Sequence, residues 1–264
     1  MSVLVTVVVV VAAIVLLGWL GLQVKPSPFP PFGETGTQPE TVPLPDGLPA
    51  PVERFYRELY GDQVPVIDSA VISGRGRLRI RGITFPARFR FTHGAGVTYR
   101  HDIEVTFFGL TLMKVKEVYE RGWARLELPF GVSEGPQVTQ GANLALWGEA
   151  IWFPSIWVTD SRVRWERMDE ETAVLVVPYG DYNEMSQRFV ARFDPDTGLL
   201  RFLESMRYKG EESEEKTLWI NEVTEWGTLR GEMAATEAEV TWFDEGTPWA
   251  TFDVEEIIYV AEGE

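Results

Sequence analysis

The segment RGRLRIRGITFPARFRF, residues 75–91, decides the fold expected for this chain. Arginine alternates with glycine or an aliphatic residue over residues 75–81, and with phenylalanine over residues 88–91. Successive side chains of a β-strand point to opposite faces of a sheet. Each run therefore predicts a strand with one arginine-rich face and one apolar face.

The same two-residue alternation continues towards the C-terminus. Turn residues such as those of the segment Asp194-Pro195-Asp196-Thr197-Gly198 separate the runs. Short amphipathic helices are expected over residues 52–60 and about 140–152, the second ending before Pro154. The pattern predicts a mainly β (α+β) fold: one large curled antiparallel sheet or half-barrel with two short helices, its concave side filled by a helix or a ligand. Further strands are expected over residues 97–108, 111–121, 123–128, 160–168, 172–179, 185–194, 199–208, 216–224, 235–243 and 249–260.

The N-terminal segment predicts a single transmembrane helix. Residues 3–24 carry no charge and are long enough to cross the hydrocarbon core of a bilayer. A cleaved signal peptide is the alternative, but no basic residue precedes the run and no small-x-small cleavage site follows it. We expect an anchor helix over residues 1–25, a proline-rich linker over 26–51 that resists helix and sheet, and a β-rich domain over 52–264.

Charge and cysteine content exclude several classes of function. The chain has no cysteine, which excludes disulfides and thiolate metal sites, and its formal net charge is −16. Residues 51–130 carry 13 basic and 9 acidic side chains, whereas residues 131–264 carry 10 and 28. An acidic second half repels phosphate backbones, so no nucleic-acid partner is expected. The bilayer is the expected partner of residues 3–24. An N-terminal anchor followed by a β-rich domain favours an extracytoplasmic location, whereas Lys25 on the domain side of the helix favours the cytoplasmic side by the positive-inside rule.

Neither a catalytic nor a metal-binding group can be assembled from the sequence. The two histidines are His93, assigned to a turn, and His101. Neither accompanies a nucleophile-elbow motif. The segment 194–198 lacks most of the ligands of a calcium loop. We therefore expect no catalytic residue, no metal and no cofactor, and an enzymatic function is not favoured.

Two groups of residues are candidate binding surfaces. Aromatic residues around the second helix are placed to line the mouth of a curled sheet, and Glu149 among them is either an exposed cap or a polar group in the cavity. The arginines of the first strand form a solvated face paired with acidic residues, or a contact for an anionic surface or partner. The candidate ligand-binding residues are Trp147, Glu149, Trp152, Phe153 and Trp157, and the candidate anionic-surface residues are Arg75, Arg77, Arg79 and Arg81.

Three segments carry a resemblance to a known family. These are WGEAIWFP at residues 147–154, VRWE at 163–166 and FDPDTG at 193–198. Together they resemble a bacterial domain family of unknown function whose members share an acid–x–x–Trp–(Phe/Leu)–Pro helix end. The resemblance covers about residues 50–260 and implies no established activity. The expected curled sheet is also similar to LolA/LolB-like lipoprotein-carrier half-barrels, which hold acyl chains, although a permanent anchor departs from a soluble shuttle.

Two functions follow as expectations. The first is a non-enzymatic, membrane-tethered domain that binds a hydrophobic or lipid-like ligand in the curl of its sheet. The second is a structural or assembly subunit of a larger membrane protein complex, for which the arginine-rich face and the acidic second half would be docking faces.

Overall fold

The computed structural model describes residues 3–33, 39–180 and 182–260. Its helices are α1 (Val3–Gln23), α2 (Ala50–Tyr60), α3 (Pro136–Gly148), the 3-10 helix η1 (Glu149–Trp152) and the single turn α4 (Ile156–Thr159). Its strands are β1 (Thr41–Pro43), β2 (Gln63–Pro65), β3 (Ser69–Ile80), β4 (Ile83–Gly94), β5 (Thr98–Phe107), β6 (Leu110–Glu120), β7 (Trp123–Leu128), β8 (Gly131–Ser133), β9 (Arg164–Arg167), β10 (Thr172–Tyr179), β11 (Tyr182–Phe193), β12 (Leu200–Arg207), β13 (Thr217–Leu229), β14 (Glu232–Trp242) and β15 (Pro248–Val260).

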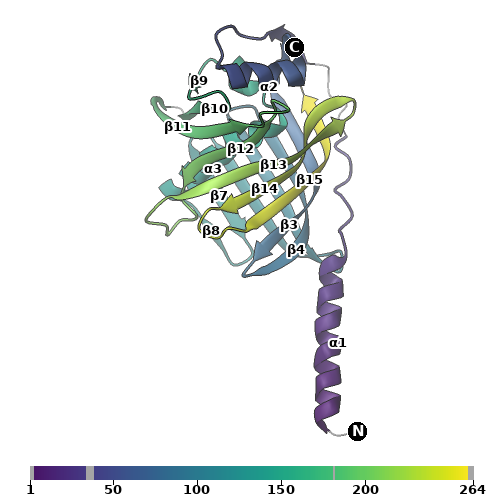
Figure 1. Ribbon diagram of the computed structural model, residues 1–264. Helices are drawn as coiled ribbons and strands as arrows, with labels where there is room; N and C mark the ends of the chain where they lie inside the picture. The colour runs from purple at the N-terminus through teal and green to yellow at the C-terminus, as the bar shows by residue number, and fades with distance from the viewer. Residues whose placement is uncertain (1–2, 34–38, 181, 261–264) are drawn as a thin grey trace.

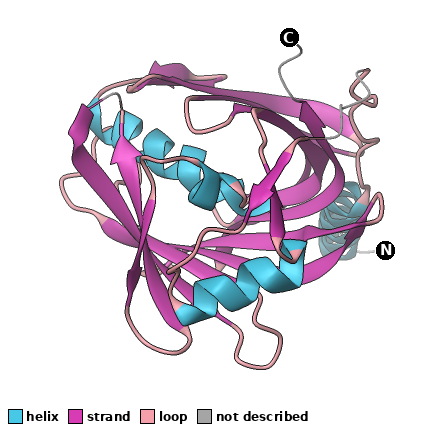
Figure 2. Cartoon of the chain, turned by 90° about the horizontal axis from the view of Figure 1, so that it is seen from above, coloured by secondary structure: helices cyan, strands magenta, loops and turns pink. Residues whose placement is uncertain are grey.

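Thirteen strands form one antiparallel sheet, in the order β8-β7-β6-β5-β4-β3-β15-β14-β13-β12-β11-β10-β9. The sheet curls around a helical segment (Figure 2). In the part of the chain that the structure describes, the edge strands β8 and β9 do not pair with each other. The sheet is therefore a half-barrel, and the mainly β fold with a large antiparallel sheet is confirmed.

Two-residue turns set the register of several hairpins. In each, a residue with positive φ precedes a glycine with positive φ, which matches the right-handed twist of paired strands. The turns are Arg81-Gly82, Phe108-Gly109, Arg121-Gly122 and Arg230-Gly231. Arg81 therefore belongs to the β3–β4 turn, and its assignment to the arginine-bearing strand was wrong.

Two glycines and a register shift occur where β3 pairs with β15. Gly74 and Gly76 pass so close to β15 that a Cβ atom on either would lie 2.1 Å from a carbonyl oxygen of that strand. The register also shifts between Val254 and Glu256. Glycines and bulges of this kind let a sheet bend sharply instead of remaining flat.

Helix α3 fills the concave side of the half-barrel. Ten of its thirteen residues are buried, as expected for a helix that is covered on all sides. Asn143, a buried polar residue of α3, accepts a hydrogen bond from the Tyr119 hydroxyl at 2.6 Å and donates to the Pro178 carbonyl at 3.0 Å. These bonds join α3 to β6 and β10, which lie towards opposite edges of the sheet.

Helix α2 and the segment after η1 close one end of the half-barrel, called the distal end below (Figure 1). The apolar face of α2 is buried, with Val52, Phe55 and Tyr56 fully enclosed. The Tyr56 hydroxyl donates a hydrogen bond to the Pro154 carbonyl at 2.7 Å, and the Tyr259 hydroxyl donates to the Trp152 carbonyl at 2.9 Å. The helix expected over residues 52–60 is thus present.

Replacing Tyr56 by phenylalanine is expected to lower the free energy of unfolding by about 1–2 kcal/mol. The substitution keeps the buried ring but leaves the Pro154 carbonyl without its donor. Urea denaturation of the full chain in detergent micelles, followed by tryptophan fluorescence, measures the change. Tyr179→Phe, which removes the hydroxyl of a half-buried tyrosine, is the matched control, and an equal loss in both variants would contradict the assignment.

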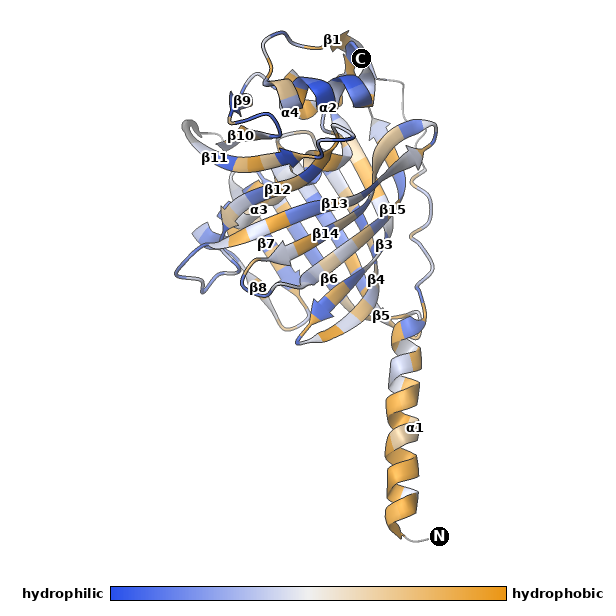
Figure 3. Cartoon of the chain, viewed as in Figure 1, coloured by the Kyte–Doolittle hydropathy of each residue, from blue (hydrophilic) through white to orange (hydrophobic). Residues whose placement is uncertain are grey.

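Helix α1 is long enough and apolar enough to cross a membrane, and it is hydrophobic along most of its length (Figure 3). Within the described residues, its most hydrophobic stretch is not buried. Its last turn contacts the β5–β6 hairpin, where the Phe108 N–H donates to the Gly21 carbonyl at 3.0 Å. A side chain at Gly21 would overlap the rings of Phe107 and Phe108. The apolar helix is thus held directly against the domain.

The segment after α1 lies along the outer face of the sheet instead of extending freely. The Arg88 guanidinium donates to the Ser27 carbonyl at 3.1 Å and lies 4.6 Å from the centroid of the Phe29 ring. Arg90 donates to the Pro30 carbonyl. A proline-rich chain leaves its carbonyl groups unpaired, so they are free to accept these bonds.

Three local expectations differ from the structure. Thr41–Pro43 pairs with Gln63–Pro65 as a small second sheet, and α2 begins at Ala50, so part of the segment 26–51 does form strand and helix. The second helix begins at Pro136, because proline at the first turn of a helix sacrifices no hydrogen bond. Strand β4 continues to Gly94 and contains His93.

Candidate functional site

A cavity of about 410 Å³ lies between the concave face of the sheet and the end of α3. Most of its walls are apolar. Its inner end is formed by buried residues such as Phe91, Trp152 and Trp219, and its outer end by Phe130, which is 78% exposed. The cavity therefore runs from a closed interior to an opening at the end of the half-barrel opposite α2. Its polar lining residues are Arg79, His101, Glu117, Glu149, Arg207, Lys209, Asn221 and Glu239.

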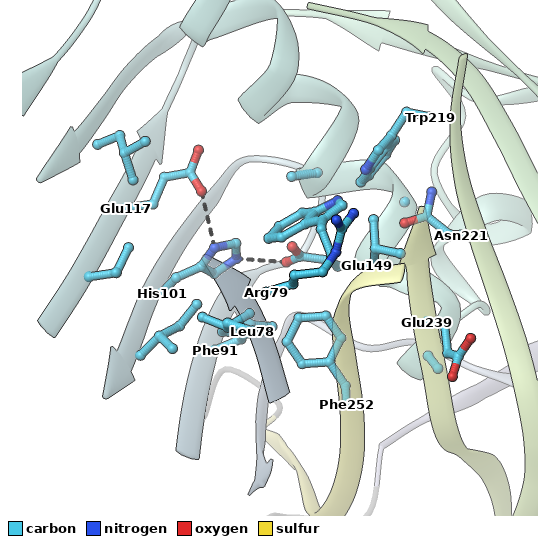
Figure 4. Close-up of a pocket in the computed structure, with 18 of the residues that line it drawn as sticks. Leu78, Arg79, Phe91, His101, Glu117, Glu149, Trp219, Asn221, Glu239 and Phe252 are labelled. Atoms are coloured by element: carbon cyan, nitrogen blue, oxygen red, sulfur yellow. Dashed lines mark hydrogen bonds and ion pairs between the residues drawn. The ribbon is translucent and has the colours of Figure 1, made fainter. Parts of the chain in front are cut away.

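A cluster of charged side chains lies at the inner end of the cavity (Figure 4). His101 on β5 lies between two carboxylates: its Nε2 atom is 2.7 Å from Glu149 Oε2, and its Nδ1 atom is 3.4 Å from Glu117 Oε2. His93 on β4 approaches the same oxygen of Glu149 at 3.1 Å. The guanidinium carbon of Arg207 is 4.5 Å from the centroid of the Trp219 ring. We call His93, His101, Glu117 and Glu149 the inner cluster.

The pKa values follow from burial opposed by these contacts. Burial alone would lower the pKa of His101, but the charges and hydrogen bonds of Glu149 and Glu117 outweigh it and raise this pKa to about 9. Burial would raise the pKa of Glu149, but the charge and hydrogen bond of His101 dominate and lower it to about 2. Burial lowers the pKa of His93. At neutral pH the cluster therefore contains a charged His101 and a neutral His93.

The inner cluster also has the donor types of a metal site. Among the described residues, one donor atom each from His93, His101 and Glu149 lie within 4.8 Å of one another. Imidazole nitrogens and a carboxylate suit ions such as zinc. The ion pair between His101 and Glu149 satisfies both charges by itself, so the arrangement does not require a cation.

The stability of the fold is expected to vary with pH through this cluster. The pKa of His101 rises from 6.5 to about 9 on folding, so its stabilising contribution is complete below pH 6.5 and is lost as the pH rises through 9. The pKa of Glu149 falls from 4.5 to about 2, so its contribution is complete above pH 4.5 and is lost as the pH falls towards 2. The combined contribution of His101 and Glu149 should therefore be largest between about pH 4.5 and 6.5 and should decline from pH 6.5 to 9. The lowered pKa of His93 acts in the opposite sense, because its burial as a neutral ring costs stability below pH 6.5.

Urea denaturation of the full chain at a series of pH values measures this profile. In the variant Glu149→Gln the decline on the alkaline side should move to lower pH, because His101 loses one of its two carboxylate partners. A stability that stays constant between pH 6 and 9 would contradict the assignment of a charged His101.

Two of the five candidate ligand-binding residues line the cavity. Glu149 and Trp152 are on its wall, whereas the structure places the other three in the surrounding core. Trp147 and Trp157 are buried and joined by a hydrogen bond from Trp157 Nε1 to the Trp147 carbonyl at 3.0 Å. Phe153 is buried with its ring centroid 5.2 Å from that of His93.

The arginines of β3 bind groups of their own chain. Arg75 pairs with Glu255 of β15, and Arg79 pairs with Glu245 at 2.7 Å. The Arg77 guanidinium lies 3.5 Å from the Leu22 carbonyl at the end of α1. Arg81 is exposed in the β3–β4 turn.

The sequence interpretation missed the histidines of the inner cluster. A signal was present: His93 has the same strand parity as Phe89 and Phe91, whose rings are buried on the concave face. Assigning His93 to a turn removed it from that face. The approach of Glu149 to both histidines depends on how α3 enters the half-barrel, and no local pattern encodes it.

The fold and cavity define the class of this protein: an antiparallel half-barrel with an apolar cavity and a buried charged cluster. Residues 38–254 match the model of a family of unknown function, DUF6544, and the chain belongs to that family. The expected resemblance to a domain family of unknown function is thereby confirmed. No curated protein matches the chain.

Solved structures with a similar chain path include LolA-like proteins, as expected. A LolA superfamily protein from Nitrosomonas europaea is 11% identical with a TM-score of 0.46, and the match covers 83% of this chain and 96% of that one. A putative outer membrane lipoprotein-sorting protein domain from Vibrio parahaemolyticus is 11% identical with a TM-score of 0.40, covering 81% and 91%. A DUF1329 family protein from Desulfovibrio piger is 14% identical with a TM-score of 0.39, covering 75% and 88%.

Proposed function

We propose that this protein is a membrane-tethered domain that binds a hydrophobic or lipid-like ligand in the cavity of its half-barrel, without catalysing a reaction on it. The observation that carries the proposal is the cavity itself. Its volume of about 410 Å³ lies within the range of small-molecule sites, and its walls are mostly apolar. Burying an acyl chain against such walls is favourable by about 25 cal/mol per Å² of apolar surface removed from water.

The inner cluster provides polar side chains that can bind the polar group of such a ligand. Glu149 and His101 both line the cavity at its inner end. A ligand with a polar group and one hydrocarbon chain can contact these side chains while its chain occupies the apolar walls. Glu149 then has the role of polar group in the cavity, one of its two expected roles.

The tether is α1. Its 21 residues span about 31 Å at 1.5 Å per residue, close to the thickness of the hydrocarbon core. We place the domain on the extracytoplasmic side. Labelling of the variant Met168→Cys in intact cells by a membrane-impermeant maleimide tests this side, because the natural chain has no cysteine and Met168 is exposed. Absence of labelling before lysis would reverse the assignment.

Native mass spectrometry of the full chain after extraction in a mild detergent tests ligand binding. We expect one co-purifying lipid or fatty acid per chain, resistant to detergent exchange. A chain that carries no adduct, and that binds no dansyl-labelled fatty acid after extraction, would overturn the proposed function. The alternative of an assembly subunit relied on the arginine face and the acidic second half as docking faces. Of the arginines, Arg75, Arg77 and Arg79 contact groups within the chain.

A further inference from the structure

We infer that the open end of the half-barrel dips into the bilayer beside α1, so that the cavity exchanges its ligand directly with the lipid leaflet that holds the anchor. The exchange of ligand rests on the proposed ligand binding, whereas the docking of the open end rests on the proposed tether α1 and not on any ligand. The surface concerned, called the apolar rim here, consists of Ile83, Phe108, Leu110, Leu112, Phe130 and Val132, all exposed on the hairpins β3–β4, β5–β6 and β7–β8.

Large exposed side chains are the first argument. Leu110 is 74% exposed, Leu112 62% and Phe130 78%. Exposed apolar groups gathered on neighbouring hairpins mark an interaction surface, since soluble surfaces seldom leave them in water. These three lie near the tips of hairpins at one end of the half-barrel, so the partner must approach that end.

The position of α1 identifies the partner as the bilayer. The Phe108 N–H is bonded to the Gly21 carbonyl, and Gly21 is two residues from the end of the helix. Two residues of helix correspond to about 3 Å. A helix that crosses the hydrocarbon core therefore brings the β5–β6 hairpin to within one helical turn of the membrane surface.

The strap formed by residues 24–33 holds the domain in this position. Arg88 and Arg90 bind its backbone carbonyls at Ser27 and Pro30, so the domain does not swing on a free linker. The strap runs up the outside of the sheet from α1 towards the distal end (Figure 1). The open end consequently remains next to the anchor.

The cavity opens at the same end. Leu78 and Ile80 at the end of β3, and Phe130 between β7 and β8, line the cavity near the apolar rim. The distal end is covered by α2, whose Tyr56 is bonded to Pro154. A hydrocarbon chain that leaves the cavity through the open end therefore passes from apolar walls to an apolar rim without crossing water.

Charge supports contact with lipid headgroups on the α1 side of the opening. Lys25 and Arg81 are exposed close to the apolar rim. The acidic residues of the loop 211–215 join β12 to β13 on the other wall of the half-barrel. Anionic headgroups are attracted to the basic side and repelled by the acidic loop. The domain should therefore tilt so that the wall formed by β3–β8 lies nearer the membrane than the wall that carries the acidic loop.

Depth-dependent quenching of single labels tests the docking. Leu110→Cys and Phe130→Cys, each labelled with the dye NBD, are reconstituted as full chains in vesicles of phosphatidylcholine and phosphatidylglycerol. Met168→Cys and Val42→Cys at the distal end are the matched controls, since both side chains are also exposed. Lipids with a nitroxide on the acyl chain should quench the two rim labels several-fold more than the distal labels, and only the rim labels should show blue-shifted emission. Equal, weak quenching of all four would overturn the inference.

Ligand exchange tests the second half of the inference. The double variant Leu110→Asp/Leu112→Asp changes two exposed rim residues that lie outside the cavity lining. It should slow transfer of a dansyl-labelled fatty acid from vesicles into the cavity at least tenfold, while its equilibrium binding in detergent stays unchanged. Met168→Asp is the control. Unchanged transfer in the double variant would overturn direct exchange. Quenched rim labels on a wild-type chain that binds no fatty acid would instead refute the proposed function and leave the docking intact.

Discussion

Replacing Glu149 by alanine is expected to lower the free energy of unfolding by about 3–5 kcal/mol, a large fraction of the stability of a domain. The reason is the position of the carboxylate. Glu149 Oε2 lies 2.7 Å from His101 Nε2 and 3.1 Å from His93 Nε2, and both imidazole rings are buried. Removing it leaves a buried imidazolium with only Glu117 as a partner, so His101 either remains charged at a cost or loses its proton.

Glutamine at position 149 separates charge from hydrogen bonding. Glu149→Gln keeps an oxygen that can accept from His101 but removes the negative charge, so its loss of stability should be smaller than that of Glu149→Ala. The matched control is Glu166→Ala, whose pairing with Arg188 is exposed on the outer surface. Exposed pairs contribute less than about 1 kcal/mol.

Urea denaturation of the full chain in detergent micelles, followed by tryptophan fluorescence, gives the change in the free energy of unfolding for Glu149→Ala, Glu149→Gln and Glu166→Ala. NMR titration of the imidazole resonances gives the pKa of His101 in the glutamine variant, which should fall from about 9. If Glu149→Ala proves no more destabilising than Glu166→Ala, the inner cluster does not hold the buried ion pair described here.

Replacing Ala238 by tryptophan is expected to abolish ligand binding while the fold persists. Ala238 is buried on β14 and lines the cavity, so an indole at this position projects into the space that the proposed ligand occupies. The affinity should fall at least about tenfold, equivalent to 1.4 kcal/mol. The cavity can accept part of the added volume, which limits the overpacking strain to about 1–3 kcal/mol.

Glu237→Trp is the matched control, because it places the same side chain on the exposed face of the same strand. Native mass spectrometry and displacement of a dansyl-labelled fatty acid measure binding, and circular dichroism checks the fold. Full lipid occupancy in a correctly folded Ala238→Trp variant would show that the ligand, if any, is held elsewhere.

Most of the strands of this protein could be predicted from the sequence, because the period of two is a local property. Strands β7 and β10 have the bounds expected from their alternation, and α2 differs from its expected bounds by two residues. The turn between β13 and β14, Arg230-Gly231, was missed, which cut both strands short. An arginine does not signal a turn by itself, and the positive φ it adopts there is imposed by the twist of the two strands.

The candidate site was predictable only in part. Glu149 and Trp152 were chosen because they lie near the end of an apolar helix, and both line the cavity. Trp147 and Trp157 share that neighbourhood in sequence but point into the packed core. A helix that is apolar on all sides gives no periodic signal to show which of its faces meets a cavity.

The sequence by itself determined the apolar helix at the N-terminus, the antiparallel strands and the absence of cysteine chemistry, because each depends on composition or on the spacing of neighbouring residues. The tertiary structure alone decided that the sheet remains open, that α3 fills it, and that His93, His101, Glu117 and Glu149 meet at the inner end of a cavity. These features depend on contacts between residues distant along the chain. Such contacts depend on how β3 pairs with β15 and on how α3 packs, and the periodicity within one segment does not encode either.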